Sequence, residues 1–135
     1  MDDCLFCGIA AKKIPSQIVY EDDDAVAFLD IMPRAPGHTV VIPKHHAPTL
    51  AALPDAEVGP LFAAVKRVAR LLAERLSPDG ITIGINQGRA SGQEVDHLHV
   101  HLIPRRTGDG GGSVQSVVNA KSFASLEEMR KKIAG

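Results

Sequence analysis

The stretch His97-Leu98-His99-Val100-His101-Leu102-Ile103 is the most informative part of this sequence. Successive side chains of a β-strand point to opposite faces, so a strand here would present three imidazoles on one face and three aliphatic side chains on the other. Neighbouring imidazoles would then lie roughly 6.6 Å apart, which lets two of them reach one phosphate group or one metal ion. The pattern predicts a strand with a core face and a chemically active face.

Two other interpretations of the three histidines stay open at this point. They could coat a solvated strand face, or they could hold a metal ion by themselves. The strict alternation beside an unbroken aliphatic face favours a third interpretation, imidazole chemistry on a phosphate.

Composition indicates one globular domain and excludes several classes of function. The chain has 135 residues, 44% of them hydrophobic, with 15 basic and 16 acidic residues. This balance gives no basic surface for nucleic acid, and the apolar runs are too short to span a membrane. The segment Met1-Asp2-Asp3-Cys4 lacks the basic and apolar regions of a signal peptide, so we expect a cytoplasmic protein.

The rest of the chain predicts an alternation of short strands and helices. The apolar residues between Val58 and Leu76 recur at helical spacing, whereas Ile81, Ile83 and Ile85 alternate as in a strand. The other expected elements are a short helix over Cys4–Ala11 and strands over Ile18–Tyr20, Ala25–Leu29 and Thr39–Ile42.

The C-terminal part, residues 107–135, is expected to be a glycine-rich linker followed by a helix. Gly108–Gly112 contains four glycines and predicts a flexible stretch. Ser125 and Glu128 have the spacing of a capping box at a helix start. We expect this helix to pack on the same domain or on a dimer partner, through the apolar residues Leu126, Met129 and Ile133.

The histidine stretch resembles the signature of the histidine triad (HIT) superfamily, in which three histidines alternate with apolar residues. The resemblance covers residues 4 to about 106 and includes Phe28–Ile31, Pro36–Lys44, Asn86 and Gly92-Gln93. It implies an α+β fold over residues 1–106, in which an antiparallel sheet of about five strands has flanking helices, usually in a homodimer. It also implies a nucleotide hydrolase or transferase that acts on the α-phosphate.

The resemblance assigns different roles to the histidines. His99 is similar to the family nucleophile, which attacks the α-phosphorus and forms a nucleotidyl-histidine. His101 is similar to the residue that contacts the phosphate and the leaving group. His38 resembles an upstream histidine that orients the triad and relays protons, although a histidine capping the start of a strand is the structural alternative.

The resemblance also supplies a nucleotide site for a purine nucleotide such as AMP or GMP. Asp30 resembles the carboxylate that binds the ribose hydroxyls, while capping a turn is its structural alternative. Phe6, Ile9 and Ile31 are expected either to pack on the base or to belong to the core. No organic cofactor is expected.

Three further groups are candidates for binding the phosphate. Asn86 and Gln93 are neutral amides beside glycines, and they, like the Val95 N–H, could donate hydrogen bonds to it. Ordinary loop contacts are the alternative for both amides. The nucleoside-phosphoramidase branch usually carries Ser or Thr at the position of Glu94, and a carboxylate repels phosphate unless it turns outward.

The pair Cys4-Leu5-Phe6-Cys7 predicts a metal site, with a redox pair or two buried thiols as alternatives. A thioredoxin-like site would need a preceding strand, for which there is no room so close to residue 1. Some bacterial HIT proteins resemble this chain and bind zinc at the positions of Cys4, Cys7, His46 and His97. The resemblance therefore implies a closed, structural Cys2His2 zinc site, with His45 the less suitable of the two adjacent histidines.

Together these patterns predict a nucleotide hydrolase of the nucleoside-phosphoramidase type. The segment Ile103–Asp109 resembles the corresponding part of dinucleoside polyphosphate hydrolases, which makes that activity the main rival. A nucleotide-binding adaptor with little turnover and a zinc-dependent interaction domain are the alternatives from other classes.

Overall fold

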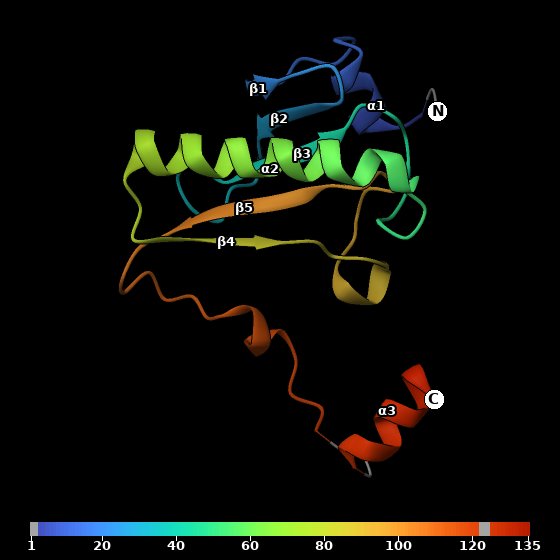
Figure 1. Ribbon diagram of the computed structural model, residues 1–135. Coiled ribbons are helices and arrows are strands. Elements are labelled where there is room, and N and C mark those ends of the chain that lie inside the picture. The colour runs from blue at the N-terminus through green and yellow to red at the C-terminus, as the bar shows by residue number, and fades with distance from the viewer. Residues whose placement is uncertain (1–2, 122–124) are drawn as a thin grey trace.

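The computed structural model describes residues 3–121 and 125–135. Five strands form one sheet, helices flank it, and a further helix follows near the C-terminus, which confirms the predicted α+β class (Figure 1). The elements are α1 (Leu5–Ala10), β1 (Ile18–Glu21), β2 (Ala25–Leu29), β3 (Thr39–Pro43), α2 (Asp55–Leu76), β4 (Gly80–Gly84), β5 (Val100–Arg105), α3 (Leu126–Ala134) and two 3₁₀ turns, Arg89–Ser91 and Val114–Val117.

The sheet is antiparallel throughout, with strand order β1-β2-β3-β5-β4. Its central strand β3 is buried on both faces and alternates between them: Val41 packs in one apolar cluster, whereas Val40 and Ile42 pack in another. The two faces of the sheet therefore have separate cores.

The long helix α2 covers one face of the sheet. Its buried residues recur at three- and four-residue spacing, as the sequence predicts: Leu61, Ala64, Val65, Val68 and Leu72. They share a cluster with Leu98, Val100 and Leu102. The aliphatic side of the histidine stretch is thus part of the main core.

The short helix α1 packs on the opposite face. Its buried residues Phe6 and Ile9 join the second cluster, with Phe28 of β2 and Val40 of β3. Because side chains alternate along β5, His99 and His101 lie on this same face, away from the Val100 and Leu102 core. The fold therefore brings the start of the chain onto the histidines.

The histidine stretch is a strand for only part of its predicted length. β5 begins at Val100, which pairs with Val41 of β3, so His97 and His99 precede the ladder. Pro43 ends β3 and has no N–H to continue the pairing. The alternation of faces nevertheless extends upstream, because Leu98 packs in the α2 core and its N–H donates to the Ala47 carbonyl at 2.7 Å.

The predicted flexible linker contains an ordered turn. The Arg105 guanidinium donates to both carboxylate oxygens of Asp109, at 2.7 and 2.9 Å, and to the Gly112 carbonyl at 2.7 Å. Asp109 in turn accepts the Gly111 N–H at 2.9 Å. These bonds hold the segment against the end of β5. The sequence predicts flexibility from the four glycines, whose pattern does not show the contacts that Arg105 and Asp109 make.

The C-terminal helix forms as predicted but does not pack on the body of the chain. Ser125 Oγ accepts the Glu128 N–H at 3.1 Å, as expected for the cap. Leu126 and Ile133 are 77% and 79% exposed, and Figure 1 shows α3 standing apart from the sheet. Packing on a dimer partner stays a prediction. Among the described residues, no helix has the length and apolar character needed to cross a membrane.

Candidate active site and metal centre

The three triad histidines lie in a row on the α1 face, with Phe6 against two of them. The Phe6 ring meets His99 edge to face, with centroids 5.1 Å apart, and His97 at 6.0 Å. The ring centroids of His99 and His101 are 5.1 Å apart. His97 is fully buried and His99 is 8% exposed, so neither is a solvated surface histidine.

The hydrogen bonds around His99 determine which of its nitrogens is available for chemistry. Its Nδ1 lies 2.7 Å from the His97 carbonyl oxygen. A carbonyl only accepts, so Nδ1 carries the proton of the neutral ring and Nε2 carries the lone pair. His99 therefore has the tautomer that a nucleophilic Nε2 requires.

His38 and His101 form a directed hydrogen-bond chain. The Arg34 N–H donates to His38 Nδ1 at 3.1 Å, so the proton of a neutral His38 is on Nε2. That Nε2 is 3.0 Å from His101 Nδ1, which accepts and leaves the His101 proton on Nε2. This hydrogen-bond chain therefore ends at the Nε2–H of His101.

Both histidines of this chain are neutral near pH 7. Burial lowers the pKa of His101 to about 4, and the nearby His99 and His38 add to the effect. Burial also lowers the pKa of His38, against an opposing influence of the Asp30 carboxylate. The tautomers derived from the hydrogen bonds are therefore those of the resting protein.

An apolar cleft of about 150 Å³ lies beside the triad, between α1 and β2. Phe6 and Ile9 line it and also belong to the core, so the two interpretations of these residues are compatible. Ile31 lines its rim and is 91% exposed. Asp30 lines the same cleft, accepts the Met32 N–H on Oδ1 at 2.8 Å, and places Oδ2 3.6 Å from His38 Nε2.

The two amides predicted to bind phosphate differ in the structure. Gln93 is buried, and its Nε2 donates to the carbonyls of Pro48 at 2.7 Å and Val95 at 3.0 Å, while its Oε1 accepts the Gly88 N–H. Both amide hydrogens have carbonyl acceptors in this structure, where Gln93 organises the loop, and its donation to phosphate stays a prediction. Asn86 is exposed and stays a candidate.

Glu94 and Val95 border a second groove, of about 430 Å³, beside the first residues that the structure describes. Cys4 and His46 line this groove as well. Glu94 is exposed, and the triad histidines His97, His99 and His101 are not among the residues that line this groove. The Val95 N–H has no protein acceptor in the described part of the chain, which keeps it a candidate donor.

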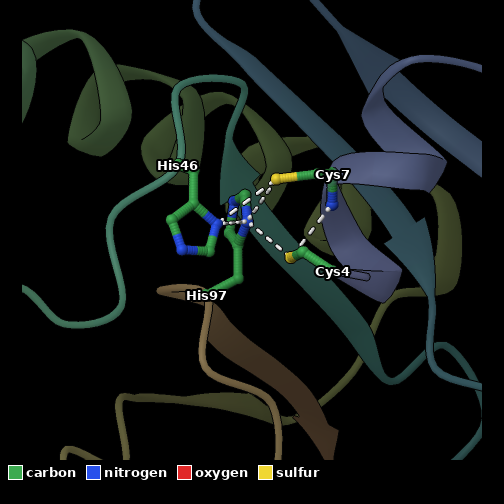
Figure 2. Close-up of side chains that lie close together, drawn as sticks. All are labelled: Cys4, Cys7, His46 and His97. Atoms are coloured by element: carbon green, nitrogen blue, oxygen red, sulfur yellow. Dashed lines mark hydrogen bonds between the residues drawn. The ribbon is translucent and has the colours of Figure 1, made fainter. Parts of the chain in front are cut away.

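Cys4, Cys7, His46 and His97 converge at one point (Figure 2). The Nδ1 atoms of His46 and His97 are 3.2 Å apart, and the sulfur–nitrogen distances are 3.3 to 3.5 Å. Tetrahedral zinc, with bonds of about 2.3 Å to sulfur and about 2.0–2.1 Å to nitrogen, places its ligand atoms about 3.3–3.8 Å apart, and the two sulfur atoms are the widest pair. The four side chains therefore have the spacing of a closed zinc site.

The surrounding groups favour a cation at this point. His97 Nε2 donates to the Pro43 carbonyl at 2.8 Å, which directs the Nδ1 lone pair at the cluster. Burial lowers the pKa of His97 to about 4, so the ring is neutral and able to ligate. Burial and the adjacent Cys4 raise the pKa of the Cys7 thiol to about 11, and a bound cation is what would favour its thiolate. His45 lies outside the cluster and contacts Glu57 at 2.8 Å.

Asp30, His38 and His101 also lie within ligating distance of one another. The Arg34 N–H keeps the His38 proton on Nε2, the atom that would have to ligate. This second group is therefore a hydrogen-bond chain and not a metal site.

Sequence reasoning missed the main-chain groups that determine the state of each imidazole. The Arg34 N–H, the Pro43 carbonyl and the His97 carbonyl assign the tautomers of His38, His97 and His99. Side-chain identity carries no signal for such contacts, because every residue except proline offers the same main-chain groups.

The site defines a class of protein: an α+β domain with a row of tautomer-assigned histidines between an apolar cleft and a Cys2His2 centre. The HIT domain family matches residues 11–108, and the chain belongs to this family. An uncharacterised HIT-like protein from Methanocaldococcus jannaschii is 43% identical over 98% of this chain and 99% of its own length.

Solved structures agree with this assignment. A HIT family protein from Bacillus subtilis has a TM-score of 0.86 and 39% identity over 98% of this chain and 95% of that one. A zinc-bound histidine triad protein from Mycobacterium smegmatis has a TM-score of 0.76 and 42% identity over 81% and 79%. A histidine triad nucleotide-binding protein from Candida albicans has a TM-score of 0.80 and 35% identity over 97% and 94%.

Proposed function

We propose that this protein is a nucleotide hydrolase that cleaves the bond to the α-phosphate of purine nucleoside phosphoramidates, through a nucleotidyl-His99 intermediate. The observation that carries the proposal is the tautomer of His99, whose Nδ1–H is held by the His97 carbonyl at 2.7 Å and whose Nε2 is left as a nucleophile. A neutral imidazole with a free lone pair attacks phosphorus without first losing a proton.

His101 and His38 direct an N–H at the phosphate and the leaving group. His101 carries a proton on Nε2, directed onward from the chain, and this N–H is a donor for a phosphate oxygen or for the leaving nitrogen. As the phosphorus–nitrogen bond breaks, the leaving nitrogen takes its proton from solvent, because the neutral His101 ring keeps its own. Water then attacks the nucleotidyl-histidine, releases the nucleotide and regenerates His99.

The nucleotide itself has a matching site. The cleft beside Phe6 is lined mainly by apolar side chains and suits a purine base, and Asp30 at its edge has the carboxylate to accept bonds from ribose hydroxyls. Asp30 also lies 3.6 Å from His38, so a ribose bound there is next to the histidine chain. The nucleotide-binding description of the Candida albicans protein is consistent with this use of the cleft.

We propose that the Cys2His2 cluster holds a structural zinc ion. All four ligand positions come from the protein, which leaves no open position for substrate. The zinc-bound Mycobacterium smegmatis relative supports this assignment. Zinc would stabilise the fold around His97 and would take no part in the chemistry.

The rival substrate, a dinucleoside polyphosphate, has less support from the structure. Its additional phosphates would need cations, and the segment that suggested this activity contains Arg105 and Arg106. Arg105 is bound to Asp109, and Arg106 donates to the carbonyls of Leu76 and Ser77 at the end of α2. Both guanidinium groups therefore have structural partners.

A comparison of substrates tests the proposal. Purified protein, His99→Ala and the matched control His45→Ala are assayed on adenosine 5′-phosphoramidate and on a diadenosine polyphosphate. We expect turnover of the phosphoramidate by wild type and His45→Ala only. Faster cleavage of the dinucleotide would establish the rival activity, and tight AMP binding without turnover would establish an adaptor.

The exposed apolar residues of α3 support a homodimer in which each tail packs on the other copy. Leu126 is 77% and Ile133 is 79% exposed, and they belong to an apolar stripe of the kind that normally faces another surface. Leu126→Asp/Ile133→Asp protein should sediment as a monomer if the tail holds the dimer. An unchanged sedimentation coefficient would exclude that role.

A further inference from the structure

Helix α1 contributes to both candidate sites at once. Cys4 caps its N-terminus and Cys7 lies in its first turn, and both are in the Cys2His2 cluster. Between and after them, Phe6 and Ile9 form one wall of the apolar cleft. The six-residue helix and its N-cap residue thus carry half of the metal ligands and one wall of the base site.

Such a helix depends on its attachments. A single isolated helix shorter than about 12 residues is marginal in water, so α1 is held in place by what its side chains bind. The Cys4 Sγ accepts the Cys7 N–H at 3.3 Å and lies 3.4 Å from His97 Nδ1. On its other side, Phe6 meets Phe28 of β2 edge to face at 5.3 Å. Ile9 is buried in the same apolar cluster as Phe6. The Cys2His2 cluster and this apolar packing are the two anchors of α1.

The same cluster also extends to the nucleophile. His97 is one of its members, and the His97 carbonyl accepts the proton that gives His99 its reactive tautomer. Phe6 packs against the ring of His99 from the other side, at 5.1 Å. The position of the His99 ring and the wall of the cleft therefore both depend on how the cluster is held.

We propose that metal binding and nucleotide binding are coupled through α1, with Phe6 as the positioning residue that links them. This inference rests on the proposed nucleotide site. Zinc bound to Cys4 and Cys7 fixes α1 against the sheet, which keeps Phe6 in the cleft wall. Without the metal, α1 loses one of its two anchors, and the base loses part of its contact surface.

The coupling is measured with AMP and zinc as the two ligands of the full-length protein. We expect AMP to bind about tenfold more weakly after zinc is removed by a chelator, and to recover on reloading. Because coupling between two binding equilibria is reciprocal, saturating AMP should raise the zinc affinity by the same factor in a chelator competition.

Hydrogen exchange supplies a readout that is independent of AMP. The amides of Gly8 and Ala11 donate to the Cys4 and Cys7 carbonyls, both at 3.0 Å. We expect these amides to exchange faster in the zinc-free protein, while amides of β3 and β5 stay protected. Unchanged exchange in α1 would overturn the inference.

A pair of variants tests Phe6 in protein that keeps its zinc. Phe6→Ala should weaken AMP binding and reduce the factor by which AMP raises the zinc affinity. Phe62 lies in α2, on the other face of the sheet, and is 38% exposed. Phe62→Ala should change neither the AMP affinity nor the factor by which AMP raises the zinc affinity. Equal AMP affinity with and without zinc, or a Phe6→Ala protein with the wild-type factor, overturns the coupling and leaves the proposed function intact. No AMP binding to either form overturns both.

Discussion

His38 Nε2 lies 3.0 Å from His101 Nδ1, and the proton between them belongs to His38 because the Arg34 N–H occupies the other nitrogen of that ring. A main-chain amide thus determines how two catalytic candidates share protons. The contact also explains why three ligand-type side chains, Asp30, His38 and His101, do not form a metal site.

Nitrogen-15 chemical shifts of the imidazoles test these tautomers. We expect protonated Nε2 in His38 and His101 and protonated Nδ1 in His99 at pH 7.5. Arg34→Pro removes the amide hydrogen and should shift His38 towards a mixture of tautomers, whereas Arg34→Ala keeps the amide and should preserve the wild-type shifts. Wild-type His38 with its proton on Nδ1 would contradict the assignment.

Protein stability should fall in acid because His101 is buried in its neutral form. Its pKa is about 4 in the folded protein and about 6.5 when unfolded, so between these values the unfolded chain binds more protons. The contribution of His101 to the free energy of unfolding is therefore complete above about pH 6.5 and is lost progressively towards pH 4.

Urea unfolding of wild type and His101→Asn across this range measures the effect. The difference in unfolding free energy between the two proteins should shrink as the pH falls from 7 to 4. A constant difference would show that His101 titrates alike in the folded and unfolded states.

Metal content tests the Cys2His2 centre. Protein purified without chelators should contain one zinc ion per chain, and Cys4→Ser should lose it, since a thiolate ligand at this position is replaced by a poorer one. His45→Ala should retain the full amount, because His45 contacts Glu57 and not the cluster. Stoichiometric zinc in Cys4→Ser would contradict the four-ligand site.

Two glycines should respond in opposite ways to alanine. Gly37, in the loop that leads to His38, has a φ of +89°, and a Cβ there would clash with Leu76 Cδ1. Gly37→Ala should lower the free energy of unfolding by about 1–3 kcal/mol because of the strained backbone. Gly80 begins β4 with open space around its Cβ position, and Gly80→Ala should raise it by about 0.5–1 kcal/mol. Urea denaturation measures both changes in the free energy of unfolding, and equal effects of the two substitutions would contradict this prediction.

Much of the site follows from side-chain patterns along the chain. The alternation around His99 predicts which face is core, since Val100 and Leu102 pack under α2 as expected. The spacing of Cys4 and Cys7 predicts a ligand pair, and the family resemblance supplies His46 and His97, which the fold brings to them.

The remaining features depend on main-chain contacts that residue types do not encode. Gln93 has the chemistry of a phosphate donor, but the carbonyls of Pro48 and Val95 occupy it. The predicted strand is shortened by the end of β3 at Pro43, and the turn after β5 is ordered by Arg105 and Asp109. These three features depend on contacts between loops that are far apart in the sequence. Only the assembled fold determines which loops meet.

The central claim is the nucleotidyl-His99 intermediate, and trapping it is the most direct test. Protein mixed with adenosine 5′-phosphoramidate is quenched within the first turnover, digested and examined by mass spectrometry. We predict one adenylyl group on the peptide that contains His99, and none in the His99→Ala protein. Adenylation of another residue, or hydrolysis at the wild-type rate by His99→Ala, would contradict the account.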